Sequence, residues 1–217
     1  MMQEEGVAAG VGILRQREKF AAVTIYATFA FVGLGAIGEM LELGGVIDLV
    51  DAPDAPLAVV YQAVMLANLA VFIASVIAIS MWIYRAHANL HEAGLPALKF
   101  SPGWAVGWYF IPIANLFKPF QAMRELWTDS HQTSDSFSAD PPGNLGAWWG
   151  LWIVGNILGN ISTRLSLLGD GTTIQLAIAL GLASSFCTLF SAWLLLGIIR
   201  QITAAQTDGL EAAQIFE

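Results

Sequence analysis

The chain has 217 residues, of which 56% are hydrophobic and only 12% are charged, against roughly 25% charged in an ordinary soluble domain. A soluble domain of this size cannot bury so much apolar surface, so the composition indicates an integral membrane protein in contact with lipid. The net charge of −8 argues against a nucleic-acid partner, because proteins that bind nucleic acids present basic surfaces.

Four long apolar runs predict four transmembrane helices, because about 20 apolar residues are needed to cross the hydrocarbon core. The runs cover about 20–38, 57–84, 145–168 and 172–199. The first run is longer than the apolar core of a cleaved signal peptide, so we expect it to remain as an anchor. The expected fold class is an all-α bundle in a single transmembrane domain, 20–200, with short segments at 1–19 and 201–217.

The nine Lys and Arg residues predict the orientation of the chain, because basic residues remain on the cytoplasmic side of a membrane. Arg15, Arg17 and Lys19 precede the first run, whereas the following loop, 39–56, carries five acidic residues and no basic one. We therefore expect the N-terminus in the cytoplasm. Four crossings return the C-terminus to the same side.

The segment 103–117 is uncharged but short, and Pro112 lies near its middle. If it crossed as a fifth span, three basic residues would lie outside. If it does not cross, only Arg164 lies outside. We therefore predict that about 102–127 forms a re-entrant or interfacial hairpin on the cytoplasmic side, with five spans as the alternative. In the four-span arrangement every Trp lies in the cytoplasmic half, consistent with the preference of Trp for the membrane interface.

The third run is the most polar of the four. Asn156, Asn160 and Arg164 are spaced by four residues and share one helical face. Gly155 and Gly159 lie beside them as a pair of small residues that lets a second helix approach closely. We expect the carboxamides to face other helices or a wet cavity. Helix packing is the simpler interpretation, and a ligand or permeation path is the alternative.

The sequence offers little chemistry of its own. His87 and His91 have a spacing that suits two metal ligands, but no cysteine or carboxylate with ligand spacing accompanies them. We therefore predict no metal and no cofactor. There is also no Gly-x-Ser-x-Gly motif, no phosphate loop and no His-Glu-x-x-His motif. We expect a protein that is not an enzyme.

The hairpin region carries the remaining candidates for binding lipid, a ligand or a partner, because basic groups at a membrane surface hold lipid phosphates. These candidates are Arg85, Asn89, Pro102, Trp104, Trp108, Pro112, Asn115, Lys118, Pro119 and Arg124.

The same region carries a family resemblance. The chain reads Arg-Ala-His-Ala-Asn at 85–89, Ser-Pro-Gly-Trp-Ala-Val-Gly-Trp at 101–108, Phe-Ile-Pro-Ile-Ala-Asn-Leu at 110–116, Lys-Pro at 118–119 and Met-Arg-Glu-Leu-Trp at 123–127. This pattern resembles a bacterial membrane family known as domain of unknown function 4328, with the resemblance extending over 57–200. It implies a four-span bacterial membrane protein, and it implies neither an activity nor a catalytic residue.

These observations predict a non-enzymatic accessory, scaffold or interaction subunit of a complex in the bacterial cytoplasmic (inner) membrane. Its expected partners are membrane lipid and either another membrane protein or a second copy of the chain. Two alternatives remain, a small oligomeric transporter or channel and a lipid-binding protein. The break at Pro112 and the Asn156–Asn160 face motivate the transporter, because discontinuous helices often line substrate sites.

Overall fold

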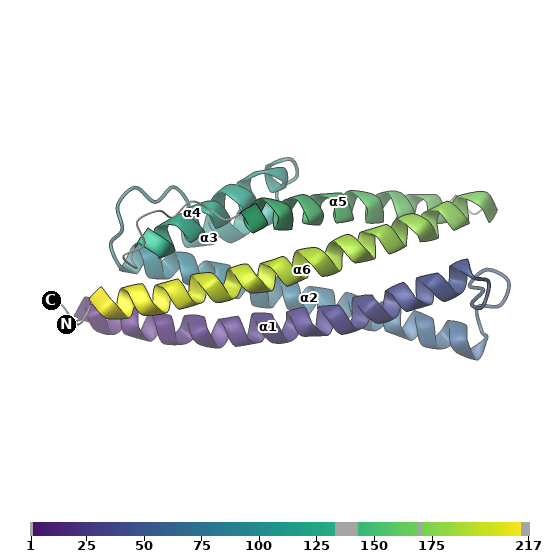
Figure 1. Cartoon of the computed structure of the whole chain (residues 1–217), viewed down its shortest axis with the longest axis horizontal. Coiled ribbons are helices and arrows are strands. Elements are labelled where there is room, and N and C mark those ends of the chain that lie inside the picture. The colour runs from purple at the N-terminus through teal and green to yellow at the C-terminus, as the bar shows by residue number, and fades with distance from the viewer. Residues whose placement is uncertain (1, 133–142, 169–170, 214–217) are drawn as a thin grey trace. The chain divides into compact units, whose positions relative to one another are not determined.

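The computed structural model describes residues 2–132, 143–168 and 171–213. Within these ranges the regular structure is entirely helical, which confirms the predicted all-α class (Figure 1). The helices are α1 (Met2–Leu43), α2 (Pro56–Glu92), α3 (Pro102–Gly107), α4 (Lys118–Gln132), α5 (Gly143–Ser166) and α6 (Gly171–Ala213), with two short 3-10 helices, η1 (Trp108–Phe110) and η2 (Ala114–Leu116), between α3 and α4.

Three of the described helices are long and apolar enough to cross a membrane, not the four predicted. They cover Ala8–Leu43, Pro56–Glu92 and Thr173–Gly209. The expected third span is helical as α5, but it does not reach the required hydropathy. The physical reason is its composition, because Asn156, Asn160 and several glycines and tryptophans replace aliphatic side chains there.

The long helices extend well beyond the apolar runs. α1 has 42 residues, which at 1.5 Å per residue is about 63 Å, twice the thickness of the hydrocarbon core. The expected terminal segments are therefore continuations of α1 and α6 as far as they are described, and 214–217 lie outside the described residues.

The acidic loop expected at 39–56 begins later than predicted, because α1 continues to Leu43. Gly45 then adopts a φ of +71°, and the N–H groups of Gly45 and Val46 donate to the carbonyls of Glu42 and Leu41. This is the hydrogen-bond pattern of a glycine-terminated helix. Glu39 is consequently a helix residue, and its carboxylate accepts a hydrogen bond from the Ser185 hydroxyl at 3.1 Å.

The chain forms two compact units. The first comprises Met1–Val23, Val76–Gly146 and Leu194–Glu217, and the second comprises Thr24–Ser75 and Ala147–Trp193. The core of the first unit contains large, fully buried side chains from four helices: Leu14, Trp82, Leu90, Met123, Leu126, Ile198, Ile199 and Ile202.

In the second unit α5 and α6 approach closely at two glycines. A Cβ on Gly155 would lie 3.1 Å from the Cβ of Cys187, and one on Gly159 would lie 3.0 Å from the hydroxyl of Ser184. The Ser184 hydroxyl donates to the Gly155 carbonyl at 2.8 Å. Small side chains on α5 thus let a polar side chain of α6 reach its backbone.

Candidate functional site

The candidate site lies in the first unit, where the chain leaves α2 and turns through α3 and α4. α2 ends like α1, because Gly94 has a φ of +72° and its N–H donates to the His91 carbonyl. Pro102 opens α3 and Pro119 lies in the first turn of α4. Proline suits these positions, because the first backbone N–H groups of a helix have no intrahelical acceptor. The two helices are thus started by the prolines that the sequence singled out.

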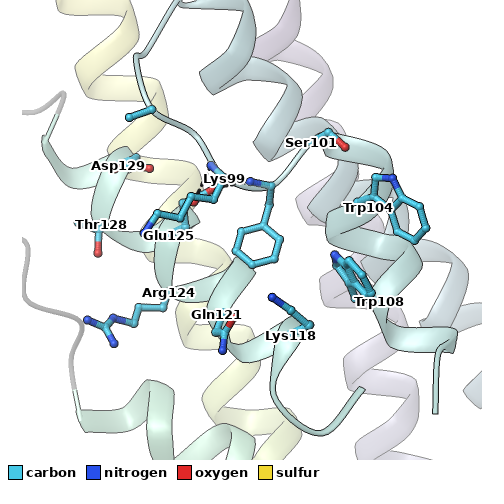
Figure 2. Close-up of a pocket in the computed structure, with 12 residues that line it drawn as sticks. Lys99, Ser101, Trp104, Trp108, Lys118, Gln121, Arg124, Glu125, Thr128 and Asp129 are labelled. Carbon is cyan, nitrogen blue, oxygen red and sulfur yellow. Dashed lines mark hydrogen bonds between the residues drawn. The ribbon is translucent and has the colours of Figure 1, made fainter. Parts of the chain in front are cut away.

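A cavity of about 650 Å³ opens between α3, α4 and the segment that leads into α3. Figure 2 shows Trp104 and Trp108 on one side of it, Lys118 near the middle, and Thr128 and Asp129 on the other side. Its lining residues are Ala97, Lys99, Phe100, Ser101, Trp104, Trp108, Lys118, Gln121, Arg124, Glu125, Thr128 and Asp129. We call this cavity the α3–α4 pocket.

The Lys118 ammonium lies among aromatic rings. Its Nζ is 5.8 Å from the ring centroid of Phe100 and 5.8 Å from that of Trp108. The Trp104 and Trp108 rings are themselves in contact, with centroids 4.9 Å apart. A ring face attracts a cation through its quadrupole but accepts no conventional hydrogen bond. The Lys118 ammonium is therefore held near the centre of the pocket with its donors available.

Glu125 builds one wall of the pocket by holding the backbone of another segment. Its two carboxylate oxygens accept hydrogen bonds from the N–H groups of Lys99, at 2.9 Å, and Phe100, at 3.0 Å. His91 Nε2 lies 3.0 Å from the carbonyl oxygen of Phe100, to which it can donate. The Phe100 backbone is thus fixed from both sides, which sets the position of the ring beneath Lys118.

The ionisable groups of the pocket are three cations, on Lys99, Lys118 and Arg124, and two carboxylates, on Glu125 and Asp129. Burial raises the pKa of the Asp129 carboxyl, the Glu125 charge raises it further, and the Lys99 ammonium opposes both effects. With both carboxylates ionised, the pocket carries a net charge of one positive unit.

Arg85 and Asn89, which the sequence grouped with the hairpin, belong to a buried polar network outside the α3–α4 pocket. Arg85 Nε donates to Asn89 Oδ1 at 2.7 Å, and the guanidinium also pairs with Glu92. Asn89 Nδ2 donates to Gln206 Oε1 at 3.0 Å. Gln206 Nε2 in turn donates to the Ala86 carbonyl at 3.0 Å and lies 2.9 Å from the Ser130 hydroxyl. This network joins α2, α4 and α6.

The turn between α3 and α4 is apolar and exposed. Ile113 has a φ of +69°, a conformation that is rare for a β-branched residue, and its side chain is 75% exposed. Phe110 is 65% exposed, and Ile111, Leu116 and Phe117 are exposed as well. Pro112 and Asn115 lie in the same turn, where the Asn115 N–H donates to the Ile111 carbonyl. We call residues 110–117 the apolar turn.

The polar face predicted on α5 finds its partners within its own helix. Asn156 Nδ2 donates to the Trp152 carbonyl at 2.7 Å, and Asn160 Nδ2 donates to the Asn156 carbonyl at 2.8 Å. Both residues are exposed, and so is Arg164 near the end of the helix. The two carboxamides therefore satisfy one donor each without a second helix.

In the parts of the chain that the structure describes, no three or more His, Cys, Asp or Glu side chains gather as metal ligands would. His87 is buried, and neither ring nitrogen has a hydrogen-bond partner there. His91 is instead directed at the Phe100 carbonyl. The two histidines, whose spacing would suit two metal ligands, therefore have different surroundings.

Several pocket residues were not among the binding candidates named from the sequence, although Ser101 and Glu125 stand in the family motif: Lys99, Phe100, Ser101, Gln121, Glu125, Thr128 and Asp129. A signal for some of them was present on α4, because Gln121, Arg124, Glu125 and Thr128 are spaced by three or four residues and so share one helical face. No sequence pattern predicts that Lys99 and Phe100 line the pocket, because Glu125, which binds their N–H groups, lies more than twenty residues away in the chain.

Comparison with known proteins supports a family but no activity. No curated protein and no solved structure matches this chain. Residues 49–204 match the family described as Domain of unknown function (DUF4328). The matched range includes the α3–α4 pocket, the apolar turn and more than half of the chain, and it contains the whole of the range 57–200 over which the sequence showed the resemblance. The chain belongs to the family Domain of unknown function (DUF4328).

Proposed function

We propose that the protein is a non-enzymatic, lipid-binding interaction subunit of the bacterial cytoplasmic membrane, in which the segment 102–132 sits at the lipid interface. The observation that carries this proposal is the apolar turn. Five of its side chains are large, apolar and exposed together, whereas soluble surfaces rarely present a contiguous apolar patch of this kind without a partner.

The residues next to the apolar turn favour lipid as the partner of its exposed side chains. Three other helices of the chain are long and apolar enough to cross a membrane, and they would hold the apolar turn close to the bilayer. Trp104 and Trp108 flank the turn on one side and Lys118 follows it on the other. Tryptophan and lysine prefer the interface and the phosphate level, respectively. An apolar tip with these neighbours fits insertion into one leaflet, and Pro112 at its centre suits a turn rather than a continuous span.

The orientation that we propose places both termini in the cytoplasm. Arg15, Arg17 and Lys19 lie in the first half of α1, and Lys99 follows α2, whereas the segment between α1 and α2 contains no basic residue. This distribution is the one expected when the N-terminus and the end of α2 are cytoplasmic. Both termini share one side only if α5 crosses together with the three apolar helices. α5 is not among the three helices that are apolar enough by composition, but its 24 residues, about 36 Å at 1.5 Å per residue, are long enough to cross.

A role as a subunit of a larger assembly is supported by a second pair of glycines on α5. A Cβ on Gly146 or on Gly150 would meet no atom within 4 Å, in contrast to Gly155 and Gly159. Spaced by four residues, Gly146 and Gly150 offer a partner helix the close approach that such pairs permit. We expect Gly150→Leu to weaken self-association or co-purification of a partner, measured by native mass spectrometry, while Gly12→Leu leaves both unchanged.

Depth-dependent fluorescence quenching tests the interfacial position of the apolar turn. In a chain with Cys187→Ala, a single cysteine at Ile113 and, as a control, one at the exposed Pro96 are labelled with an environment-sensitive dye. After reconstitution into vesicles, the dye at 113 should emit as in an apolar medium. It should be quenched by nitroxide-bearing acyl chains, and the dye at 96 by aqueous iodide. Iodide quenching at 113 equal to that at 96 would remove the basis of the proposal.

A further inference from the structure

We infer that the α3–α4 pocket binds a phosphate-bearing anion and that Lys118 is the residue that holds it. This inference goes beyond the proposed function, because the pocket can bind a soluble phosphate ester whether or not the apolar turn enters lipid. The residues that carry it are the three cations and the aromatic wall of the pocket.

The cations of the α3–α4 pocket are not neutralised by ion pairs within the described residues. Among the described residues, no carboxylate lies within ion-pair distance of Lys99, Lys118 or Arg124. One of the two carboxylates that line the cavity, Glu125, already accepts two backbone N–H groups. The pocket therefore retains an excess of positive charge that a ligand can neutralise.

The environment of Lys118 favours a ligand that accepts hydrogen bonds. The ammonium carries three N–H donors, and the rings of Phe100 and Trp108 that hold it accept none of them conventionally. Phosphate oxygens are strong acceptors, and lysine binds phosphate as a point charge. A ligand phosphate close to the Phe100 ring would supply the missing acceptors without requiring the side chain to leave the pocket.

The size of the α3–α4 pocket and its other polar groups indicate the class of ligand. A cavity of about 650 Å³ falls within the range of roughly 300–1,000 Å³ that is usual for small-molecule sites, and it is far larger than a phosphate ion. Ser101, Gln121 and Thr128 add neutral donors to the lining, and Trp104 and Trp108 add apolar wall. The fitting class of ligand is therefore an organic phosphate ester with a partly apolar remainder.

Two sources can supply such a group, a phospholipid headgroup and a soluble phosphate ester. Titration calorimetry of the purified full-length protein with glycerol 3-phosphate tests the soluble source. Native mass spectrometry after exchange into phosphatidylcholine vesicles containing phosphatidylglycerol tests the lipid source, through the retained anionic lipid.

Lys118→Met removes the ammonium and keeps most of the apolar stem, and Lys19→Met is the matched control at an exposed position outside the pocket. We expect Lys118→Met to weaken binding of the active probe by about tenfold or more, the usual effect of losing a hydrogen bond to a charged group. Lys118→Arg should retain most of the affinity. Arg124→Gln, at an exposed position, should weaken binding too, which tests the site even if Lys118→Met fails to fold.

Binding of either probe that depends on Lys118 and not on Lys19 supports the inference and identifies the source of the phosphate. If neither probe binds the unmodified protein, or if Lys118→Met and Lys19→Met bind alike, the inference is wrong. Neither result depends on the dye at position 113, so the failure of one proposal is distinguishable from the failure of the other.

Discussion

Gln206 provides the most quantitative test of how the first unit is held together. Its side chain is fully buried (0% exposed), accepts a hydrogen bond from Asn89 Nδ2 and donates to the Ala86 carbonyl. Gln206→Leu keeps a side chain of similar size and removes the polar atoms. The Ala86 carbonyl still accepts its helical N–H, and the Ser130 hydroxyl loses one of its partners. Asn89 Nδ2 loses its acceptor in a site without solvent.

The cost follows from that single orphaned donor. A buried polar group left without a partner costs about 1–3 kcal/mol. For a protein of this size, 1 kcal/mol corresponds to roughly 2–4 °C in Tm. We therefore expect Gln206→Leu to lower the Tm of the detergent-solubilised protein by about 2–12 °C.

Gln201→Leu is the matched control, since it makes the same substitution at an exposed position of the same helix, and it should leave the Tm nearly unchanged. Adding Asn89→Ala to Gln206→Leu should cost less than the sum of the two single variants, because the donor that was orphaned is then gone. Equal Tm values for Gln206→Leu and Gln201→Leu would refute the reasoning.

Two further predictions concern the second unit and the pocket. Gly38→Ala should destabilise the protein by about 1–3 kcal/mol through overpacking, because its Cβ would collide with the Tyr61 ring. Gly33→Ala meets no atom within 4 Å and should raise the Tm slightly; thermal unfolding compares the two, and equal effects would contradict the packing. Because the pKa of Asp129 is raised, phosphate binding should strengthen as the pH falls through that pKa and the carboxylate loses its charge, by up to about fivefold for one surface charge. Asp129→Asn should lack this strengthening and show only the pH dependence of the phosphate ester itself, whose second pKa is about 6. Calorimetry that shows the same pH dependence in both proteins would exclude Asp129 as its source.

The positions of α1, α2 and α6 could be predicted because hydropathy is a local property. Each contains an apolar run of the required length, but α1 and α2 continue beyond their runs to ends near Gly45 and Gly94 that were not predicted. The failure at α5 has a physical cause of the same kind. The two asparagines lower its hydropathy, and nothing in their spacing indicates that they bond to their own helix.

The pocket was only partly predictable, because its construction depends on partners that are distant in sequence. Trp104, Trp108, Lys118 and Arg124 were singled out from the motif, and the structure brings them to one cavity. Arg85 was grouped with them by proximity along the chain, yet it pairs with Glu92 instead.

The buried network around Asn89 could not be predicted from the sequence, for a related reason. Its partner Gln206 is separated from it by 117 positions. No periodicity connects residues so far apart, and only folding reveals that they meet.

The positive φ of Ile113 places the stability of the protein and its binding to the membrane in conflict. Glycine adopts a positive φ at little cost, so Ile113→Gly would relieve local strain, yet it would also delete the most exposed apolar side chain of the turn. If that side chain is the one that meets lipid, a more stable protein would be a poorer membrane binder. Selection for thermal stability alone should then favour glycine at 113, and selection in living cells should restore a bulky apolar residue.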